Sequence, residues 1–334
     1  MGLCVHNELR TKMKKSVSHA LPALVAMGAM SVSGSVLAEA GPFTIYGTVE
    51  VRSVDRDDTD LDTFVDAARL GAKQSIKLDK FDDLEARWQI EFDLANNAGL
   101  GTDDRDVGDV GVRKAQINLK NGFGEAIFGR QNNLMAAAKK IDQFKNDSGV
   151  FTQGPDRVGN ALSYVTPSFG PVNGFVQVIS DVDADDSTPA EDADGYTLGL
   201  SVVGDSYDVQ ASYYEVDEDF DSGEVELTSL GGSVSLGLLG VFATYQNEEV
   251  TGNELMGLGA SYKVEDVTFK AGYRAFDNDA SQEGSAVHLL ADYDLGEGVS
   301  AFVQYVEYDS DAETNFGHGD ALSVGVAYNF SAGI

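Results

Sequence analysis

The segment LEARWQIEFDL, residues 84–94, alternates strictly between apolar and polar side chains. Its apolar members are Leu84, Ala86, Trp88, Ile90, Phe92 and Leu94, with Glu85, Arg87, Gln89, Glu91 and Asp93 between them. This two-residue period predicts a β-strand with one apolar and one polar face. The apolar face could pack against the core of a soluble sandwich or against lipid, and the alternation alone does not decide between them.

The length and number of such runs separate the two interpretations. Strands of soluble sheets average about five or six residues, whereas the runs here reach ten to thirteen. A tilted strand needs about nine to eleven residues to cross a membrane. Sixteen runs occur, at residues 43–54, 67–78, 83–95, 110–120, 123–132, 159–167, 172–182, 195–203, 205–217, 226–238, 240–249, 254–264, 266–277, 285–294, 298–308 and 320–330. We therefore expect an all-β fold, a 16-stranded antiparallel transmembrane β-barrel.

The connections between these runs alternate in length. Short turns at Gly122, Gly204, Gly240, Glu265 and Glu297 alternate with acidic segments such as residues 55–62, 103–109, 181–194, 217–224 and 309–313, which we expect to be loops. Barrels of the outer membrane show this asymmetry, with short turns on the periplasmic side and long loops outside. Aromatic residues near strand ends are expected to form the interfacial girdles, namely Tyr46, Phe302, Tyr305, Tyr328 and Phe330.

The N-terminal segment has the pattern of a secretory leader. Lys14 and Lys15 precede the apolar residues 21–30, and small residues follow, with cleavage predicted after Ala38 or Ala40. We expect residues 1–40 to comprise an N-terminal extension and a signal peptide, and residues 41–334 to form the barrel.

Cysteine usage and charge limit the function. Cys4 is the only cysteine and precedes the predicted cleavage site, so the exported chain would have no disulfide and no lipid-modified cysteine. The net charge of −32 does not fit a nucleic-acid partner. The acidic excess has two interpretations, adaptation to a saline habitat or a role in gathering cations, and the sequence leaves both open.

The sequence resembles the trimeric general-diffusion porins of Gram-negative outer membranes. The resemblance rests on five stretches: FTIYGTVEV in the first run, ARLGAK at 68–73, VRKAQINLKNGFGEAIFGRQNN at 112–133, PDRVGNALSYVTP at 155–167, and the aromatic-ended last run. It implies an outer-membrane homotrimer in contact with lipid, without a cofactor, through which small hydrophilic solutes and ions diffuse passively. It also implies that the third external loop, within residues 132–157, folds inward and narrows the pore.

In that family, arginines on the barrel wall face acidic residues of the third loop across the constriction. Carried over to this chain, the wall residues are Arg69, Arg113 and Arg157, with Arg130 nearby. The loop acids are Asp142 and Asp147, with Asp156 as a third. Facing rows of opposite charge would set a transverse field in which polar solutes reorient and apolar ones are rejected.

The chain departs from the family pattern at several positions. Thr48 stands where many members have lysine, and Lys139, Lys140 and Lys145 add positive charge to the loop. Arg113 has the parity of the apolar face of its strand, so a bulge or a strand packed at a subunit interface is needed to explain it. Phe330 is followed by residues 331–334, whereas members of the family usually end on an aromatic residue.

Other functions remain as alternatives. A substrate-specific channel is the closest of these, a structural shell without conductance is another, and an outer-membrane hydrolase would need a histidine such as His288 beside a nucleophile. Residues 181–186, DVDADD, partly match a calcium loop but lack its glycine and glutamate. Ion preference stays open, because acidic mouths favour cations whereas a basic constriction favours anions.

Overall fold

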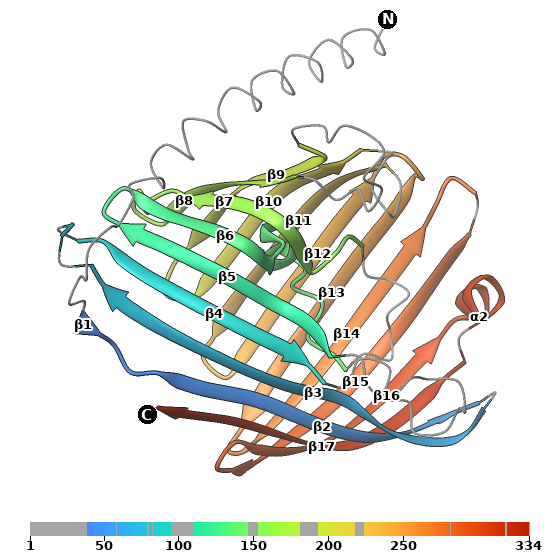
Figure 1. Cartoon of the computed structure of the whole chain (residues 1–334). Helices are drawn as coiled ribbons and strands as arrows, with labels where there is room; N and C mark the ends of the chain where they lie inside the picture. Colours follow the sequence, from blue (N-terminus) through green and yellow to red (C-terminus); the bar gives the residue numbers. More distant parts are fainter. Residues whose placement is uncertain are drawn as a thin grey trace, which may run out of the picture.

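A computed structural model describes residues 39–57, 59–78, 80–81, 83–94, 110–145, 153–180, 193–217, 224–280, 282–317 and 319–333. Within them, sixteen antiparallel strands close into a barrel, as Figure 1 shows. The strands are β2 (Thr44–Arg56), β3 (Thr59–Lys77), β4 (Glu85–Asp93), β5 (Gly111–Asn121), β6 (Gly124–Asn132), β7 (Arg157–Val165), β8 (Val172–Ile179), β9 (Gly195–Val203), β10 (Tyr207–Val216), β11 (Val225–Leu236), β12 (Leu239–Glu248), β13 (Asn253–Val264), β14 (Val267–Asp277), β15 (Glu283–Gly296), β16 (Val299–Tyr308) and β17 (Ala321–Gly333). The predicted 16-stranded barrel is confirmed.

Closure is made between the first and last barrel strands. β17 pairs with β2 over thirteen positions, from Ala321 opposite Arg56 to Gly333 opposite Thr44. Residues 331–333 therefore extend the closing ladder beyond Phe330. The two-residue strand β1 (Glu39–Ala40) pairs separately with the end of β3.

The two faces of each strand have the polarity that the alternation predicts. On β17, the side chains of Leu322, Val324, Val326 and Tyr328 are 46–50% exposed on the outer surface. The intervening Ser323 is buried in the interior. Large apolar side chains outside and small or polar ones inside suit a barrel that is surrounded by lipid and encloses water.

Two sequence-based expectations are wrong. Tyr46 and Phe302 do not belong to an outer girdle: Tyr46 bonds Glu91 inside the barrel, and Phe302 is buried there, because each has the parity of the inner face. Residues 55–62 are not a loop either. Most of them lie in the extended hairpin of β2 and β3, where Arg56 pairs with Thr59.

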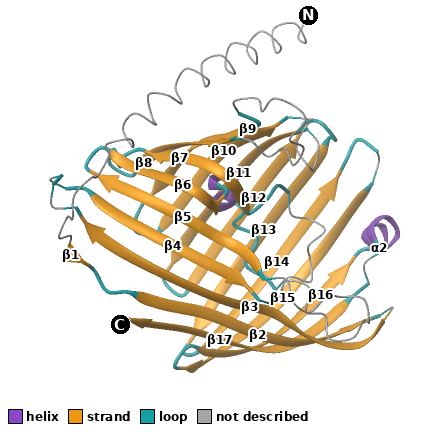
Figure 2. Ribbon diagram, in the orientation of Figure 1, coloured by secondary structure: helices purple, strands orange, loops and turns teal. Residues whose placement is uncertain are grey.

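The connections are short at one end of the barrel and longer at the other. Two-residue turns, 122–123, 237–238, 265–266 and 297–298, join successive strands at the first end. At the other end, the β16–β17 connection contains the helix α2 (Ser310–Phe316), drawn purple at the rim in Figure 2. No helix in the described part of the chain is long and apolar enough to span a membrane.

The segment between β6 and β7, residues 133–156, is called loop 3 here, and its described parts are 133–145 and 153–156. It begins with the 3-10 helix η1 (Leu134–Ala138), which lies inside the barrel. Met135 packs in an interior apolar cluster with Tyr214 and Leu227. Further along, Ile141 and Phe144 pack in a second cluster that includes Phe242 and Leu290. Part of the apolar core thus lies between loop 3 and the inner wall of β10 to β16.

Glycines on the inner wall make room for loop 3. A Cβ atom on Gly231 of β11 would overlap the carbonyl oxygen of Ala138, one on Gly257 would overlap Ile141, and one on Gly272 would overlap Phe144. These contacts fix the path of the loop along the wall, because any larger side chain would displace it.

Gly231 and Gly232 provide a matched pair for testing this packing. Gly231→Ala places a methyl group against the loop 3 backbone, so we expect the free energy of unfolding to fall by about 1–3 kcal/mol. In Gly232→Ala the nearest atom to the new methyl group, Val209 Cγ2, lies at 3.4 Å, and we expect a change within about 0.5 kcal/mol. Urea unfolding of the refolded barrel measures both, and equal effects would contradict this account of the packing.

Candidate pore constriction

Arg113 reaches the interior through a β-bulge. Between β4 and β5, Glu91 pairs with Lys114 and Phe92 pairs with Val112, so Arg113 is the extra residue. Its side chain therefore joins that of Lys114 on the inner face. Arg113 Nε donates to Glu91 Oε1 at 2.8 Å, and Nη1 donates to Asp93 Oδ2 at 3.1 Å. Of the two explanations for its parity, the bulge is the one observed.

A hydrogen-bonded group holds the acceptor of Arg113. The hydroxyl of Tyr46 donates to Glu91 Oε2 at 2.9 Å and accepts from Gln89 Nε2 at 2.6 Å. Lys73 Nζ lies 5.2 Å from the centre of the Tyr46 ring. Glu91 of β4 thus accepts from Tyr46 of β2 and from Arg113 of β5, and its bond to Tyr46 holds the carboxylate that orients the Arg113 guanidinium.

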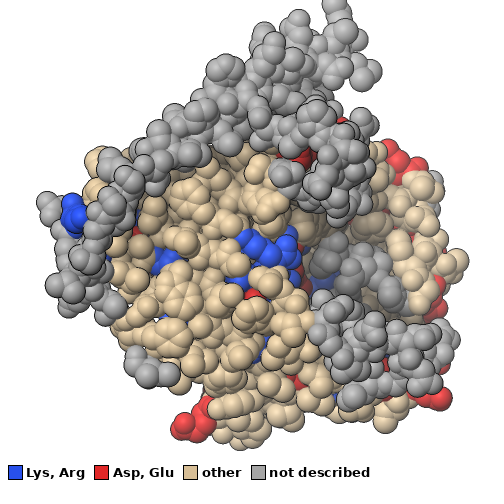
Figure 3. Space-filling view, viewed as in Figure 1, with Lys and Arg blue, Asp and Glu red and all other residues tan. Residues whose placement is uncertain are grey.

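Arg69, Lys114 and Arg157 gather around Arg113. The charge of Lys114 interacts with those of Arg113, Arg157 and Arg69, and the charge of Arg157 interacts with those of Arg113 and Arg69. These four side chains from β3, β5 and β7 therefore lie on one side of the interior. We call them the basic wall. Figure 3 shows Lys and Arg side chains gathered beside the hollow near the centre of this face.

Ion pairing within the basic wall is uneven. Arg113 has the carboxylates of Glu91 and Asp93, but no described carboxylate forms an ion pair with Arg69, Lys114 or Arg157. The Nε atom of Arg69 is buried and has no hydrogen-bond partner. The fourth predicted arginine, Arg130, is exposed, and its Nε donates to the carbonyl of Val112 at 2.7 Å.

Loop 3 turns its lysines toward the barrel wall and its own base. Lys139 Nζ bonds Asp156 Oδ1 at 2.9 Å, and Lys140 Nζ lies 2.6 Å from Asp208 Oδ1 on β10. These ion pairs neutralise Lys139 and Lys140, two of the three lysines that depart from the family pattern of an acidic third loop.

The first described part of loop 3 ends at Lys145, whose contacts attach it to the barrel wall. Its Nζ lies 2.7 Å from Glu50 Oε2 on β2 and 4.1 Å from the centre of the Phe302 ring on β16. Its backbone N–H donates to Gln304 Oε1 at 2.8 Å. We call Lys145 and these three partners the clasp. Since loop 3 leaves β6 and reaches β2 at the clasp, it crosses the interior.

Asp142 lies on the side of loop 3 that contacts its supporting wall. Its Oδ1 is 3.9 Å from Nη2 of the buried Arg274 on β14, whose Nη2 also donates to the Ile141 carbonyl at 3.0 Å. Asp142 forms no ion pair with Arg69, Arg113 or Arg157. Asp147 lies outside the described residues. Of the predicted site residues, the structure thus brings Arg69, Arg113 and Arg157 together, and places Asp142 against β14.

Sequence reasoning assigned no role at the constriction to four residues that organise this region: Glu50, Glu91, Lys114 and Lys145. Glu50, Glu91 and Lys114 show the parity of the inner face, so alternation could have marked them as lumen residues. Their partners come from distant strands, and Lys145 is on an irregular loop. Alternation carries no information about those contacts.

Other candidate sites gain little support. His288 is fully buried, and its ring stacks on Phe144 at 5.0 Å between centroids. In the described residues no group of three or more His, Cys, Asp or Glu could hold a metal ion. His318 and the calcium-like segment 181–186 lie outside the described residues.

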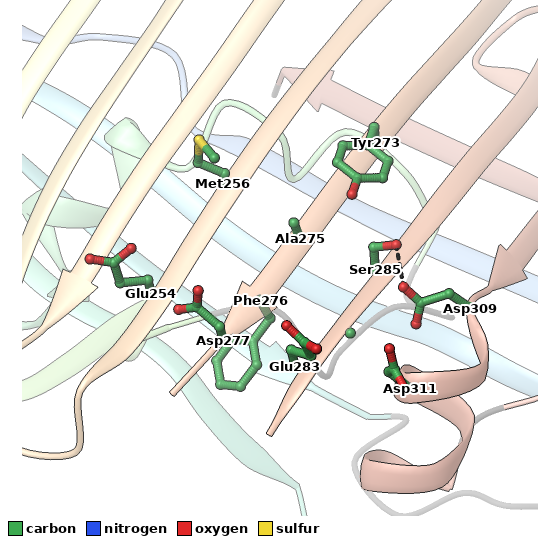
Figure 4. Close-up of a pocket in the computed structure, with 11 residues that line it drawn as sticks. Glu254, Met256, Tyr273, Ala275, Phe276, Asp277, Glu283, Ser285, Asp309 and Asp311 are labelled. Carbon is green, nitrogen blue, oxygen red and sulfur yellow. Dashed lines mark hydrogen bonds between the residues drawn. The ribbon is translucent and has the colours of Figure 1, made fainter. Parts of the chain in front are cut away.

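A pocket of about 310 Å³ lies at the outer rim between β13, β14, β15 and the start of α2. Figure 4 shows its carboxylates, those of Glu254, Asp277, Glu283, Asp309 and Asp311. Burial raises the pKa of Asp309, but hydrogen bonds from Ser285 and the backbone of Ala312 outweigh it and keep that pKa below its usual value. This rim is an acidic part of the mouth.

Comparisons with known proteins agree with this geometry. A family model described as Gram-negative porin matches residues 23–313. No curated protein sequence matches the chain significantly. Among solved structures, the chain is similar to OmpF of Salmonella typhi, with 16% identity, a TM-score of 0.69, and coverage of 86% of this chain and 97% of that one.

Two further similar structures cover 88% of this chain. The anion-selective porin from Comamonas acidovorans has 18% identity, a TM-score of 0.65 and full coverage of its own chain, 100%. A loop-deletion mutant of OmpT from Vibrio cholerae has 16% identity, a TM-score of 0.67 and 99% coverage of its own chain. At these identities the structures support the fold. With the family match over most of its length, the chain belongs to the Gram-negative porins and is an outer-membrane channel for passive diffusion.

Proposed function

We propose that loop 3 and the basic wall together form the constriction of a channel for small hydrophilic solutes and ions. The observation that carries this proposal is the clasp, which attaches the middle of the loop to β2 and β16. With its path along β10 to β16 also fixed, loop 3 leaves the remaining passage beside β3 to β7. Solutes that cross this passage must pass Arg69, Arg113, Lys114 and Arg157.

We further propose that the constriction prefers anions. The chain as a whole is acidic, with 55 Asp and Glu against 23 Lys and Arg, but charges farther apart than about 10 Å are largely screened at 0.1 M salt. An ion in the constriction is closest to the basic wall, where four cations face two carboxylates, Glu91 and Asp93. The similar fold of the Comamonas acidovorans porin, described as anion-selective, agrees with this preference.

The outer surface supports a homotrimer. Among the described strand residues, the most exposed aromatic side chains all lie on β10 to β17: Tyr207, Tyr245, Tyr262, Phe269, Tyr273, Tyr293, Tyr305 and Tyr328. Interfacial aromatics mark lipid-facing surface in outer-membrane barrels. Strands β3 to β7 carry no aromatic side chain as exposed as these in the described residues, although Phe123 in the turn between β5 and β6 is 82% exposed. The outer faces of these strands therefore suit contact with neighbouring protomers. One similar structure, OmpT of Vibrio cholerae, is described as a trimer form.

The hydrolase alternative is not favoured. Both ring nitrogens of His288 are buried without a hydrogen-bond partner, and the ring is covered by Phe144 of loop 3. A general base must reach the nucleophile that it activates. His288 therefore has the surroundings of a packing residue.

Reconstitution of the purified protein in planar bilayers tests the channel function. We expect stepwise conductance that closes in three equal levels, because each protomer would contain its own pore. Folded protein is identified by its heat-modifiable gel migration. Absence of steps from such folded protein would rule out the diffusion channel.

Breaking the clasp should loosen the constriction. Glu50→Gln leaves the Lys145 ammonium without its carboxylate, so we expect the anchoring of loop 3 to weaken by about 1–3 kcal/mol. Disaccharides should then enter proteoliposomes faster relative to monosaccharides in swelling assays. Glu307→Gln removes an exposed carboxylate from the outer face of β16 and should leave the ratio unchanged. Identical ratios in the two variants would contradict a role for the clasp.

A further inference from the structure

We propose that Arg69, Lys114 and Arg157 form a binding site for oxyanions that carry two or more negative charges, such as phosphate. The inference rests on the proposed constriction and adds a saturable site to it. A channel with such a site would conduct multivalent oxyanions through a bound state, whereas chloride would pass without appreciable binding.

The first argument is the contrast with the other cations of the interior. Arg52, Arg87, Lys139, Lys140, Lys145 and Arg274 each have a carboxylate oxygen at 2.6–3.9 Å. Arg69, Lys114 and Arg157 have no ion pair with any described carboxylate, in a chain with an excess of acidic residues. Lys270 and Arg130 also lack an ion pair with a described carboxylate, but Lys270 Nζ donates to the Gln143 carbonyl at 3.0 Å and Arg130 Nε donates to the Val112 carbonyl at 2.7 Å. Among the partly buried inner-wall cations that the structure describes, Arg69, Lys114 and Arg157 are thus the ones with neither kind of partner.

The second argument is the energetic cost of this arrangement. Arg69, Lys114 and Arg157 are partly buried, and their charges repel one another and that of Arg113. Glu91 offsets part of this repulsion at Lys114, and Asp156 offsets part of it at Arg157, but neither carboxylate forms an ion pair with them. The buried Nε of Arg69 also lacks an acceptor. Like charges held together at reduced solvation are unfavourable, and an anion that contacts several of them relieves the repulsion. Oxyanions suit this role, because guanidinium groups donate paired hydrogen bonds to their oxygens.

The third argument is that the pairing of Arg113 leaves the neighbouring cations as the available donors. Glu91 and Asp93 occupy Arg113, and Tyr46 and Gln89 fix Glu91. The bulge that turns Arg113 inward also keeps Lys114 on the inner face. Because Arg113 is already paired, the free donors are those of Arg69, Lys114 and Arg157.

Multiple charge distinguishes the expected ligand from chloride. A dianion can contact two or three of the cations at once, and each contact between opposite charges is stronger near a protein surface than in bulk water. Transport also requires release, so binding must stay weak. We therefore expect half-saturation by phosphate on the order of 1–10 mM.

The test is a titration of bilayer-inserted wild-type protein with potassium phosphate, in about 0.1 M KCl at constant pH. Phosphate bound in the constriction should lower the chloride current along a saturating curve. Potassium chloride added to the same ionic strength should raise the current. A current that rises with phosphate as it does with chloride would overturn the site while leaving the channel function intact, whereas absence of any conductance would overturn the proposed function itself.

Substitutions locate the site. Arg69→Gln, Lys114→Gln and Arg157→Gln should each raise the half-saturating phosphate concentration about tenfold, the equivalent of roughly one lost contact. Arg157→Lys keeps the charge without the forked donors and should restore part of the affinity. Arg87→Gln is the matched control, because Arg87 is also on the inner face of the wall but pairs with Glu125 at 3.5 Å.

The control variant decides between a site and general attraction. Heat-modifiable migration shows that each variant is folded. If Arg87→Gln weakens phosphate binding as much as Arg157→Gln does, net charge alone explains the effect and the proposed site is refuted. A half-saturation within twofold of wild type for Arg87→Gln supports it.

Discussion

The pairing of β17 with β2 is the constraint on which the rest of the structure depends. Lipid offers no partner for backbone N–H and C=O groups, so a sheet in a membrane must leave no open edge. Thirteen residue pairs meet at this closure, which extends past Phe330 to Gly333. A closed sheet of this size encloses water, and the general polarity of its faces follows from that: apolar side chains outside, polar and small ones inside except where the inner wall packs against loop 3.

An enclosed lumen can contain chain that a soluble sheet could not. Loop 3 uses this space, since its apolar residues pack against the inner wall where glycines leave room, and its lysines find carboxylates there. Supported along β10 to β16 and held at β2, the loop leaves the basic wall of β3 to β7 exposed to the passage. In this account the shape of the pore and its charge follow from one arrangement of the loop.

Much of the fold could be predicted from the sequence, because alternation reports directly which face of a strand a residue occupies. The outward stripe from Leu322 to Tyr328 and the inward position of Arg69 follow from parity alone. Arg113 shows the limit: its parity is that of the outer face, and only a register shift opposite Glu91 brings it inside. The ion pair between Lys145 and Glu50 was beyond prediction, since 95 residues separate the two and an irregular loop carries one of them. The acidic composition of residues 55–62 led to the wrong prediction of a loop, because the hydrogen-bonded pairing of β2 and β3 continues through these charged positions.

The central claim is that the basic wall, and not the acidic total charge, governs the ions that pass. The reversal potential across a tenfold KCl gradient tests it most directly, measured at salt concentrations high enough to screen the acidic mouths. The account predicts that the reversal potential has the sign of the chloride equilibrium potential. A potential of the opposite sign under the same conditions would mean that cations pass preferentially, and would contradict a constriction dominated by Arg69, Lys114 and Arg157.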